Sequence, residues 1–255
     1  MAMLALTHLP SLNMAGCLRM HAGPSIDLDV ALQQHAGYRR MLERCGAVVE
    51  TLDTNRDLPD CVFIEDTAII LDEIAILCSM GHPSRRDEPA GIEPHIRQHR
   101  EIRRIELPAI IDGGDVLRVG RRLIVGLSGR TSAAGIEALA ATVRPFGYQV
   151  DTVPVTGCLH LKSACTALLD GRLLANAAWL DAKALRQYRI VPVPDDEPGA
   201  ANVALVGEAV CAAAGHPQTE DLIRGLGFRV ETADLSEFGK ADGCTTCLSL
   251  LFTGK

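Results

Sequence analysis

Short apolar runs separated by polar turns occur along the whole chain, and they recur in a fixed order. Two apolar runs flank a turn, a segment with helical spacing follows, and a third apolar run ends the repeat. The clearest repeat has strands predicted at 115–119 and 123–127, a helix at 131–146 and a strand at 148–155. Three other repeats are predicted in the same order, at 62–71, 74–78, 84–99 and 102–107, at 164–169, 173–177, 181–187 and 189–193, and at 202–206, 209–213, 217–226 and 228–233.

The two ends of the chain supply the elements of a fifth repeat. A strand at 4–6, a helix that begins after Asp27 and ends at Gly46, and a strand at 47–52 would join an apolar run at 247–252. A period of about 40 to 50 residues is typical of repeat architectures, and closing the repeats into a ring removes open sheet edges. We therefore predict an α/β fold, a five-bladed α/β-propeller in a single domain over 1–255, with the N- and C-terminal strands sharing one blade.

Composition and charge exclude several classes of protein. The chain has 255 residues, a net charge of −7 and 4% aromatic residues, which does not suit a nucleic-acid-binding surface but would attract a small cationic substrate. No apolar run approaches the length of a membrane span, and the first residues lack a signal-peptide pattern. Nine cysteines without regular spacing suit a reducing compartment. We expect a cytoplasmic protein with neither a nucleic-acid nor a membrane partner.

The segment 241–252 places a polar turn with two cysteines before an apolar run. Cys247 is predicted where this turn meets a buried strand, a position where folds hold catalytic groups. Free cysteines are also among the most buried residues, so Cys247 alone would not define a site. Cys244 and Cys247 form a C-x-x-C pattern, but no second motif completes a zinc site. No metal or organic cofactor is expected.

Polar side chains also interrupt or border other apolar runs. They are Asp60, Glu65 and Asp66 around 62–71, Asp112 and Asp115 on either side of two glycines, His160 just before a predicted strand, and Arg85 and Arg130 near predicted helix starts. An unpaired carboxylate inside a strand would be costly to bury, although a solvated strand end would explain Asp60 and a hairpin turn would explain the glycines. A cysteine, a histidine and carboxylates that meet at the centre of a ring would equip a cysteine nucleophile.

Six motifs occur in order along nearly the whole chain. They are Pro59-Asp-Cys-Val-Phe-Ile-Glu-Asp-Thr-Ala68, Pro83-Ser-Arg-Arg-Asp-Glu88, Asp112-Gly-Gly-Asp-Val-Leu117, Val125-Gly-Leu-Ser-Gly-Arg-Thr131, Leu159-His-Leu-Lys-Ser163 and Asp242-Gly-Cys-Thr-Thr-Cys247. Together they closely resemble the dimethylarginine dimethylaminohydrolases of the pentein, or amidinotransferase, superfamily. That family folds as a five-bladed α/β-propeller, which agrees with the number of repeats.

The resemblance implies a role for each matched residue. It makes Cys247 the nucleophile, His160 the general acid and base, and Asp112 the carboxylate that orients the histidine. Substrate contacts are implied for Leu18 and Asp60 at the α-amino group, for Glu65 and Asp66 at the guanidinium, for Arg85 and Arg130 at the α-carboxylate, and for Asp242. The implied reaction converts asymmetric dimethylarginine and monomethylarginine to citrulline and dimethylamine or methylamine, through a covalent thiouronium and without a cofactor.

Three segments depart from the family pattern. They are Cys244, the stretch Cys78-Ser-Met-Gly81 and the opening stretch Leu6-Thr-His-Leu-Pro10. The resemblance places the second beside the substrate pocket, so hydrolysis of arginine or a related guanidine, as by an arginine deiminase, is the alternative activity. A non-catalytic protein that binds arginine derivatives, with its C-x-x-C as a redox-responsive or metal-responsive pair, is the alternative of another class. A homodimer is the oligomeric state we consider.

Overall fold

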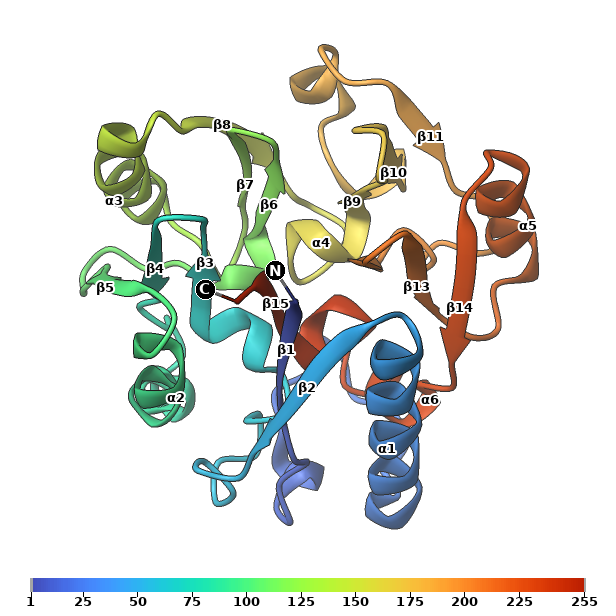
Figure 1. Ribbon diagram of the computed structural model, residues 1–255, viewed down its shortest axis with the longest axis horizontal. Helices are drawn as coiled ribbons and strands as arrows, with labels where there is room; N and C mark the ends of the chain where they lie inside the picture. The colour runs from blue at the N-terminus through green and yellow to red at the C-terminus, as the bar shows by residue number, and fades with distance from the viewer. Residues whose placement is uncertain (1, 255) are drawn as a thin grey trace. The chain divides into compact units, whose positions relative to one another are not determined.

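The computed structural model describes residues 2–254, and their strands form five three-stranded sheets (Figure 1). In every sheet the middle strand pairs antiparallel with one neighbour and parallel with the other. A parallel pair needs a crossover connection, which helical segments provide here. The predicted order of strand, strand, helix and strand is therefore confirmed. These described residues form two compact units: unit 1 runs up to Glu65 and resumes at Asn202, and unit 2 is Asp66–Ala201. The expected single domain stays a prediction.

Unit 1 contains two sheets, and one of them joins the beginning of the chain to its end. The first sheet has the order β15-β1-β2 and the second β12-β13-β14. Their elements are β1 (Met3–His8), α1 (Leu28–Arg44), β2 (Ala47–Leu52), β12 (Val203–Val206), β13 (Ala209–Ala213), α5 (Pro217–Gly225), β14 (Arg229–Ala233), α6 (Ser236–Gly239) and β15 (Ser249–Thr253). Figure 1 shows β1, in dark blue, beside β15, in dark red. The fifth repeat is thus built from both ends, as predicted.

Helix α1 shows why the first repeat folds as it does. The side chain of Asp27 accepts hydrogen bonds from the backbone N–H groups of Asp29 and Val30 and so caps the helix. The buried residues of α1 recur at helical spacing and include Tyr38, Met41 and Leu42, which pack in the core of unit 1. Burying each such side chain contributes about 1.5–3 kcal/mol.

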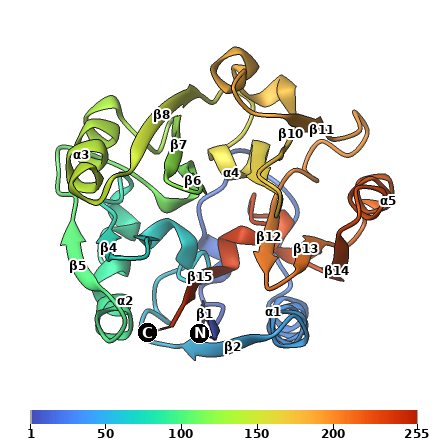
Figure 2. The same cartoon turned by 45° about the horizontal axis from the view of Figure 1, so that its top comes forward.

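Unit 2 contains the other three sheets. Their orders are β3-β4-β5, β6-β7-β8 and β11-β10-β9. The elements are β3 (Ala68–Ile70), β4 (Ile74–Leu77), α2 (Glu88–Arg97), β5 (Glu101–Arg104), β6 (Val116–Val119), β7 (Arg122–Leu127), α3 (Ala133–Val143), β8 (Gln149–Pro154), α4 (Leu161–Ala164), β9 (Cys165–Ala167), β10 (Leu173–Ala175) and β11 (Ile190–Pro192). Figure 2 shows α3 running beside β8, the strand that it leads into.

Several predicted boundaries were wrong, and three of them lie near candidate site residues. Glu65 and Asp66 lie in the 3-10 turn Ile64–Thr67, not in a strand, and Cys247 lies in the 3-10 turn Thr246–Leu248 that precedes β15. His160 is followed by the short helix α4 before its strand begins. Two predicted helices are also shorter in the structure. The segment predicted as a helix at 84–99 forms the 3-10 turn Pro83–Arg85 followed by α2, and the segment predicted as a helix at 181–187 forms only the 3-10 turn Ala182–Leu185. A short apolar run without a period does not distinguish a buried turn from a buried strand.

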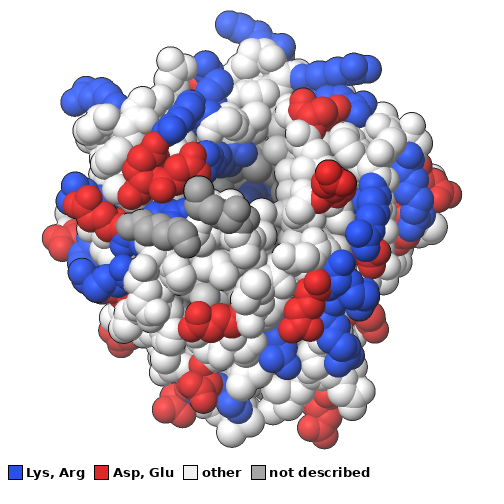
Figure 3. All heavy atoms as spheres, in the orientation of Figure 1, with Lys and Arg blue, Asp and Glu red and all other residues white. Residues whose placement is uncertain are grey.

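The charges on the surface and the hydropathy of the helices agree with what the composition indicated. Basic and acidic side chains are interspersed on the face shown in Figure 3. None of the helices formed by residues 2–254 combines the length and the hydropathy needed to cross a membrane.

Candidate active site

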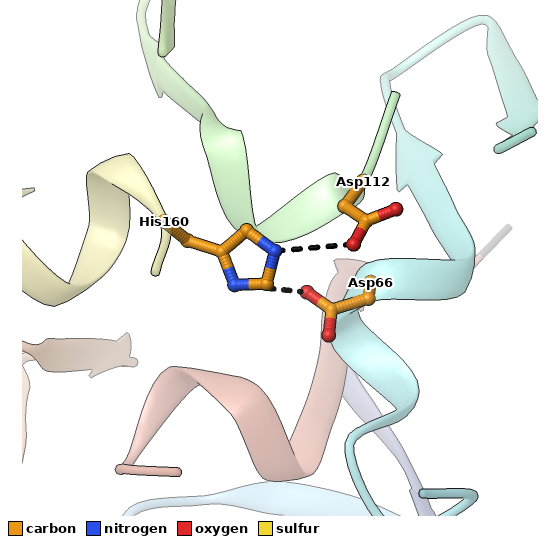
Figure 4. A group of neighbouring side chains, drawn as sticks. All are labelled: Asp66, Asp112 and His160. Atoms are coloured by element: carbon orange, nitrogen blue, oxygen red, sulfur yellow. Dashed lines mark hydrogen bonds and ion pairs between the residues drawn. The ribbon is translucent and has the colours of Figure 1, made fainter. Parts of the chain in front are cut away.

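His160, Asp112 and Asp66 form a buried cluster in unit 2 (Figure 4). The imidazole Nε2 lies 3.2 Å from Oδ2 of Asp112, and Nδ1 lies 3.7 Å from Oδ1 of Asp66. His160 is only 5% exposed and Asp112 is fully buried. The histidine therefore has a carboxylate at each ring nitrogen, which fixes its orientation and favours its protonated form.

The charges of this cluster determine the protonation of the histidine. Burial alone lowers the pKa of His160, but the negative charge of Asp66, the hydrogen bond with Asp112 and the charge of Asp115 outweigh it and raise that pKa to about 9. Burial opposes ionisation of Asp66 too, yet His160 and Arg85 lower the pKa of its carboxyl. At neutral pH the cluster thus holds an imidazolium beside ionised carboxylate, a state that can donate a proton.

Gly114 has no side chain, and the side chains of this cluster occupy the space that one would fill. Its backbone N–H donates a hydrogen bond to Oδ1 of Asp66 at 3.1 Å. A Cβ atom at this position would lie 2.5 Å from that oxygen and 2.9 Å from Cγ of His160. The two glycines between Asp112 and Asp115 were expected to allow either a turn or a close approach, and at Gly114 the close approach is what the structure shows.

Arg85 is buried between two carboxylates. Its Nε and Nη2 atoms donate to the two oxygens of Glu88 at 2.9 and 2.8 Å, and Nη1 donates to Oδ2 of Asp66 at 2.6 Å. With 2% of its surface exposed, the guanidinium has been removed from water, so these ion pairs are needed to offset the cost of burial. Arg130 is different, because its side chain is 15% exposed and its Nη1 lies 3.9 Å from Oδ2 of Asp112.

Cys247 lies in unit 1, in the turn that leads into β15. Its Sγ accepts a hydrogen bond from the backbone N–H of Cys244 at 3.4 Å. The buried hydroxyl of Tyr38 supports this turn by donating to the carbonyl of Thr245 at 2.8 Å and lying 2.7 Å from Oγ of Ser249. The half-buried thiol is therefore held on a supported backbone turn with an N–H group directed at the sulfur.

Two other candidates in unit 1 hold the loop that follows β1. Oδ1 of Asp60 accepts from the backbone N–H of Leu18 at 3.0 Å, and Oδ2 of Asp242 accepts from the N–H of Met20 at 2.6 Å. Asp242 has a φ of +58°, a left-handed conformation that is uncommon outside glycine. The resemblance pointed to both carboxylates as substrate contacts, and both organise the same loop.

Glu65 is tied to the turn that carries the cysteine. Its Oε2 accepts from the hydroxyl of Thr246 at 2.7 Å, and Oδ1 of Asn202 accepts from the N–H of Thr246 at 2.9 Å. All three side chains are buried. Neither Thr246 nor Asn202 was predicted from the sequence, since neutral polar residues next to a strand carry no distinctive pattern.

The candidates group within each unit. Unit 2 brings together Asp66, Arg85, Arg130, Asp112 and His160, and unit 1 holds Leu18, Asp60, Glu65, Asp242 and Cys247. Glu88 was missed as a partner of Arg85, although it belongs to the same sequence motif. The signal that could have found it is the cost of burying an arginine without a paired carboxylate.

The same histidine cluster is the candidate for a metal among the described residues. One ligand atom each from Asp66, Asp112 and His160 lies within 4.8 Å of the others. The contacts of Arg85 with Asp66 and of Arg130 with Asp112 already offset the carboxylate charge. The site is therefore balanced by protein cations and by the imidazolium.

Comparison with known proteins identifies close relatives. The arginine deiminase family model matches residues 28–164. The chain is 39% identical over 248 residues to the N(G),N(G)-dimethylarginine dimethylaminohydrolase of Streptomyces coelicolor, an alignment that covers 96% of this chain and 95% of the relative.

Solved structures of similar enzymes superpose on almost the whole chain. A cysteine-to-serine mutant of the dimethylarginine dimethylaminohydrolase of Pseudomonas aeruginosa, complexed with citrulline, has a TM-score of 0.94 at 31% identity and covers 99% of this chain and 100% of its own. A histidine-to-glycine mutant of such an enzyme, as an adduct with S-methyl-L-thiocitrulline, has a TM-score of 0.95 at 31% identity with the same coverage. The likeness confirms the α/β-propeller class predicted from the repeats.

Proposed function

The chain belongs to the dimethylarginine dimethylaminohydrolase family, and from this premise we propose that it hydrolyses asymmetric dimethylarginine and monomethylarginine to citrulline, with release of dimethylamine or methylamine. The observation that carries the proposal is the buried His160, held by Asp112 and by Asp66. An imidazolium beside ionised carboxylate suits a reaction that binds a cationic group and must protonate a departing amine.

The proposed reaction proceeds through a covalent intermediate on Cys247. The thiolate attacks the guanidinium carbon, and a C–S bond forms to give a tetrahedral adduct. His160 donates its proton to the methylated nitrogen, the C–N bond breaks, and the amine departs. The thiouronium is then attacked by water, which gives one proton to the neutral His160. Cleavage of the C–S bond restores the thiolate, and loss of the hydroxyl proton to solvent, where the released amine takes it up, leaves neutral citrulline. No oxidant, metal or cofactor enters these steps.

The remaining candidates would bind and align the substrate. We assign the guanidinium to the carboxylates of Glu65 and Asp66, and the α-amino group to Asp60 with the backbone of Leu18. Holding the guanidinium in one orientation removes much of the entropic cost of the attack.

The α-carboxylate would be bound by Arg130 together with Arg85. Arg130 carries more of this interaction in our proposal, because the guanidinium of Arg85 already donates to Asp66 and Glu88. Asp242 would act indirectly, by holding the loop that contains Met20, because its carboxylate accepts a hydrogen bond from the backbone N–H of Met20.

A reducing compartment suits this chemistry. All nine cysteines are free thiols, Cys247 among them, and a thiolate nucleophile is lost if it is oxidised. We therefore retain the cytoplasm as the proposed location. The absence of nucleic-acid and membrane partners and the homodimer considered from the sequence stay predictions.

The test compares purified wild-type protein with a Cys247→Ser variant and with a Cys45→Ser control, in which another half-buried cysteine of unit 1 is replaced. Each protein is incubated with asymmetric dimethylarginine, monomethylarginine and arginine, and citrulline, methylated amines and ammonia are measured. Citrulline with dimethylamine from the wild type and the control, and none from Cys247→Ser, supports the proposal. Ammonia from arginine alone assigns an arginine deiminase instead, and tight binding without any product assigns a binding protein.

A further inference from the structure

Asp115 is a buried carboxylate that the reaction described above does not use. It ends the 3-10 turn Gly113–Asp115, and none of its surface is exposed. Its Oδ1 accepts a hydrogen bond from the backbone N–H of Leu161 at 2.8 Å, and its Oδ2 accepts from the hydroxyl of Ser128 at 2.6 Å. Both partners donate, so the group acts as an acceptor at each oxygen.

The bond to Leu161 fixes the backbone that carries His160. Leu161 is the first residue of α4, and the side chain of His160, at the N-cap position, makes no capping hydrogen bond. The first N–H groups of a helix need acceptors from outside the helix. Asp115 supplies one from a different segment of the chain, and this leaves the imidazole free to meet Asp112 and Asp66.

The bond to Ser128 extends the same support to Arg130. Oγ of Ser128 donates to Asp115 and accepts from the backbone N–H of Arg130 at 3.0 Å. The backbone of Arg130 is thus linked through two hydrogen bonds to Oδ2 of Asp115, and Leu161 is bound by the other oxygen of the same carboxylate. One carboxylate therefore links the backbone of the histidine to the backbone of the arginine, although the two residues lie in different repeats.

The chain leaves room for this arrangement at Gly126 in β7. A Cβ atom there would lie 2.5 Å from Oδ1 of Asp115 and 2.9 Å from Cβ of Leu161. Real Cβ atoms do not approach so closely, so a residue larger than glycine would push apart the carboxylate and the helix start that it supports.

We propose that Asp115 is a positioning residue, which holds His160 and Arg130 in the mutual arrangement that the reaction requires. This rests on the proposed function for the roles of those two residues. Asp115 touches no reacting atom and acts through Leu161 and Ser128.

Asp115 also acts on the histidine through its charge. It is one of the three carboxylates that raise the pKa of His160, the others being Asp66 and Asp112. The charged groups around this histidine are Asp66, Asp112 and Asp115. Arg85 and Arg130 lie beside the first two, and Lys162 follows the histidine two residues later in the chain. Replacing Asp115 by asparagine keeps the shape of the side chain and removes this charge. The amide has only one acceptor oxygen, so one of the two hydrogen bonds, to Leu161 or to Ser128, is also lost or reversed.

The test uses the full chain with Asp115→Asn and Ser128→Ala, and with Asp170→Asn as the control, since Asp170 is exposed and pairs with Arg172. For Asp115→Asn we expect kcat to fall by about tenfold to a hundredfold, the loss that a small misplacement of a catalytic group causes. The pKa of His160, followed by NMR, should fall at the same time. For Ser128→Ala, which keeps the contact with Leu161, we expect a higher KM and a smaller change in kcat. Asp170→Asn should match the wild type.

Two results would overturn the proposal. One is an Asp115→Asn protein of reduced Tm whose kcat, KM and His160 titration equal those of the wild type, because a purely structural role predicts that combination. The other, which remains decisive if Asp115→Asn does not fold, is a Ser128→Ala protein with unchanged KM and kcat. Failure of the proposed function looks different, since the wild type would then release no methylated amine while the NMR titration of His160 still reports on Asp115.

Discussion

Nε2 of His160 lies 3.2 Å from Oδ2 of Asp112, although 48 residues separate them in the chain. The two residues hold equivalent positions in consecutive repeats. Asp112 immediately precedes the turn that enters β6, and His160 immediately precedes the short helix that enters β9. Both side chains thus lie at the entry to the first strand of their own sheet.

The raised pKa of His160 makes the stability of the protein depend on pH. The pKa is about 9 in the folded protein and ordinarily 6.5, so the folded state binds the proton more tightly than the unfolded state does. The stabilisation is complete below about pH 6.5, decreases as the pH rises through 9, and amounts to about 3 kcal/mol at most. Urea unfolding at pH 6 and at pH 9.5 measures the decrease. A His160→Gln variant should lose this part of the pH dependence, and an unchanged dependence in that variant would assign the effect to other groups.

Gly114→Ala should disable the histidine cluster. The added Cβ would meet Oδ1 of Asp66 at 2.5 Å and the ring of His160 at 2.9 Å, so both side chains must move. We expect kcat to fall by about a hundredfold and the free energy of unfolding to fall by about 1–3 kcal/mol. Steady-state kinetics and urea unfolding measure the two effects. Gly129→Ala is the matched control, because no atom lies within 4 Å of a Cβ placed there, and wild-type kinetics for Gly114→Ala would contradict the packing described here.

The fold was largely predictable from the sequence because its repeats are regular. Turn residues between apolar runs marked the strand pairs, and the interval 47–52 matched β2 (Ala47–Leu52) without error. The turn Ile64–Thr67 was not predictable, since its apolar neighbours fit a buried strand equally well. Tertiary contacts decide its conformation. Glu65 accepts a hydrogen bond from Thr246, and Asp66 accepts hydrogen bonds from the backbone N–H of Gly114 and from the guanidinium of Arg85.

The site was only partly predictable. Cys247, His160 and Asp112 carry chemistry that can be recognised in a motif, and the resemblance pointed to them before any geometry was available. Asp115 was noticed only as a second carboxylate beside two glycines, because its partners are a backbone N–H and a serine hydroxyl in segments that are distant in sequence. Supporting residues of this kind have no spacing rule, so only the three-dimensional contacts identify them.

Arg85 and Arg130 should respond differently to truncation. Arg85→Ala removes a buried cation that is bound to the carboxylates of both Asp66 and Glu88, which costs about 3–5 kcal/mol. Arg130→Ala removes a partly exposed side chain, so we expect nearly unchanged stability and a higher KM for the methylated arginines. Thermal or urea unfolding and steady-state kinetics separate the two cases. Equal losses of stability in both variants would contradict this division.

Cys244→Ala should leave catalysis almost unchanged. The contact of Cys244 with Cys247 is a hydrogen bond from the backbone N–H to Sγ at 3.4 Å, and alanine retains that N–H group. Alanine loses only the long contacts of the thiol with the carbonyl of Asn202 and the hydroxyl of Thr245, both at 3.8 Å, so we expect kcat within about threefold of the wild type. The pH dependence of Cys247 alkylation by iodoacetamide, measured in both proteins, reports directly on the thiolate and should coincide. A marked loss of activity, or alkylation that requires a higher pH, would show that the Cys244 thiol itself acts on the nucleophile, as the redox pair considered from the sequence would require.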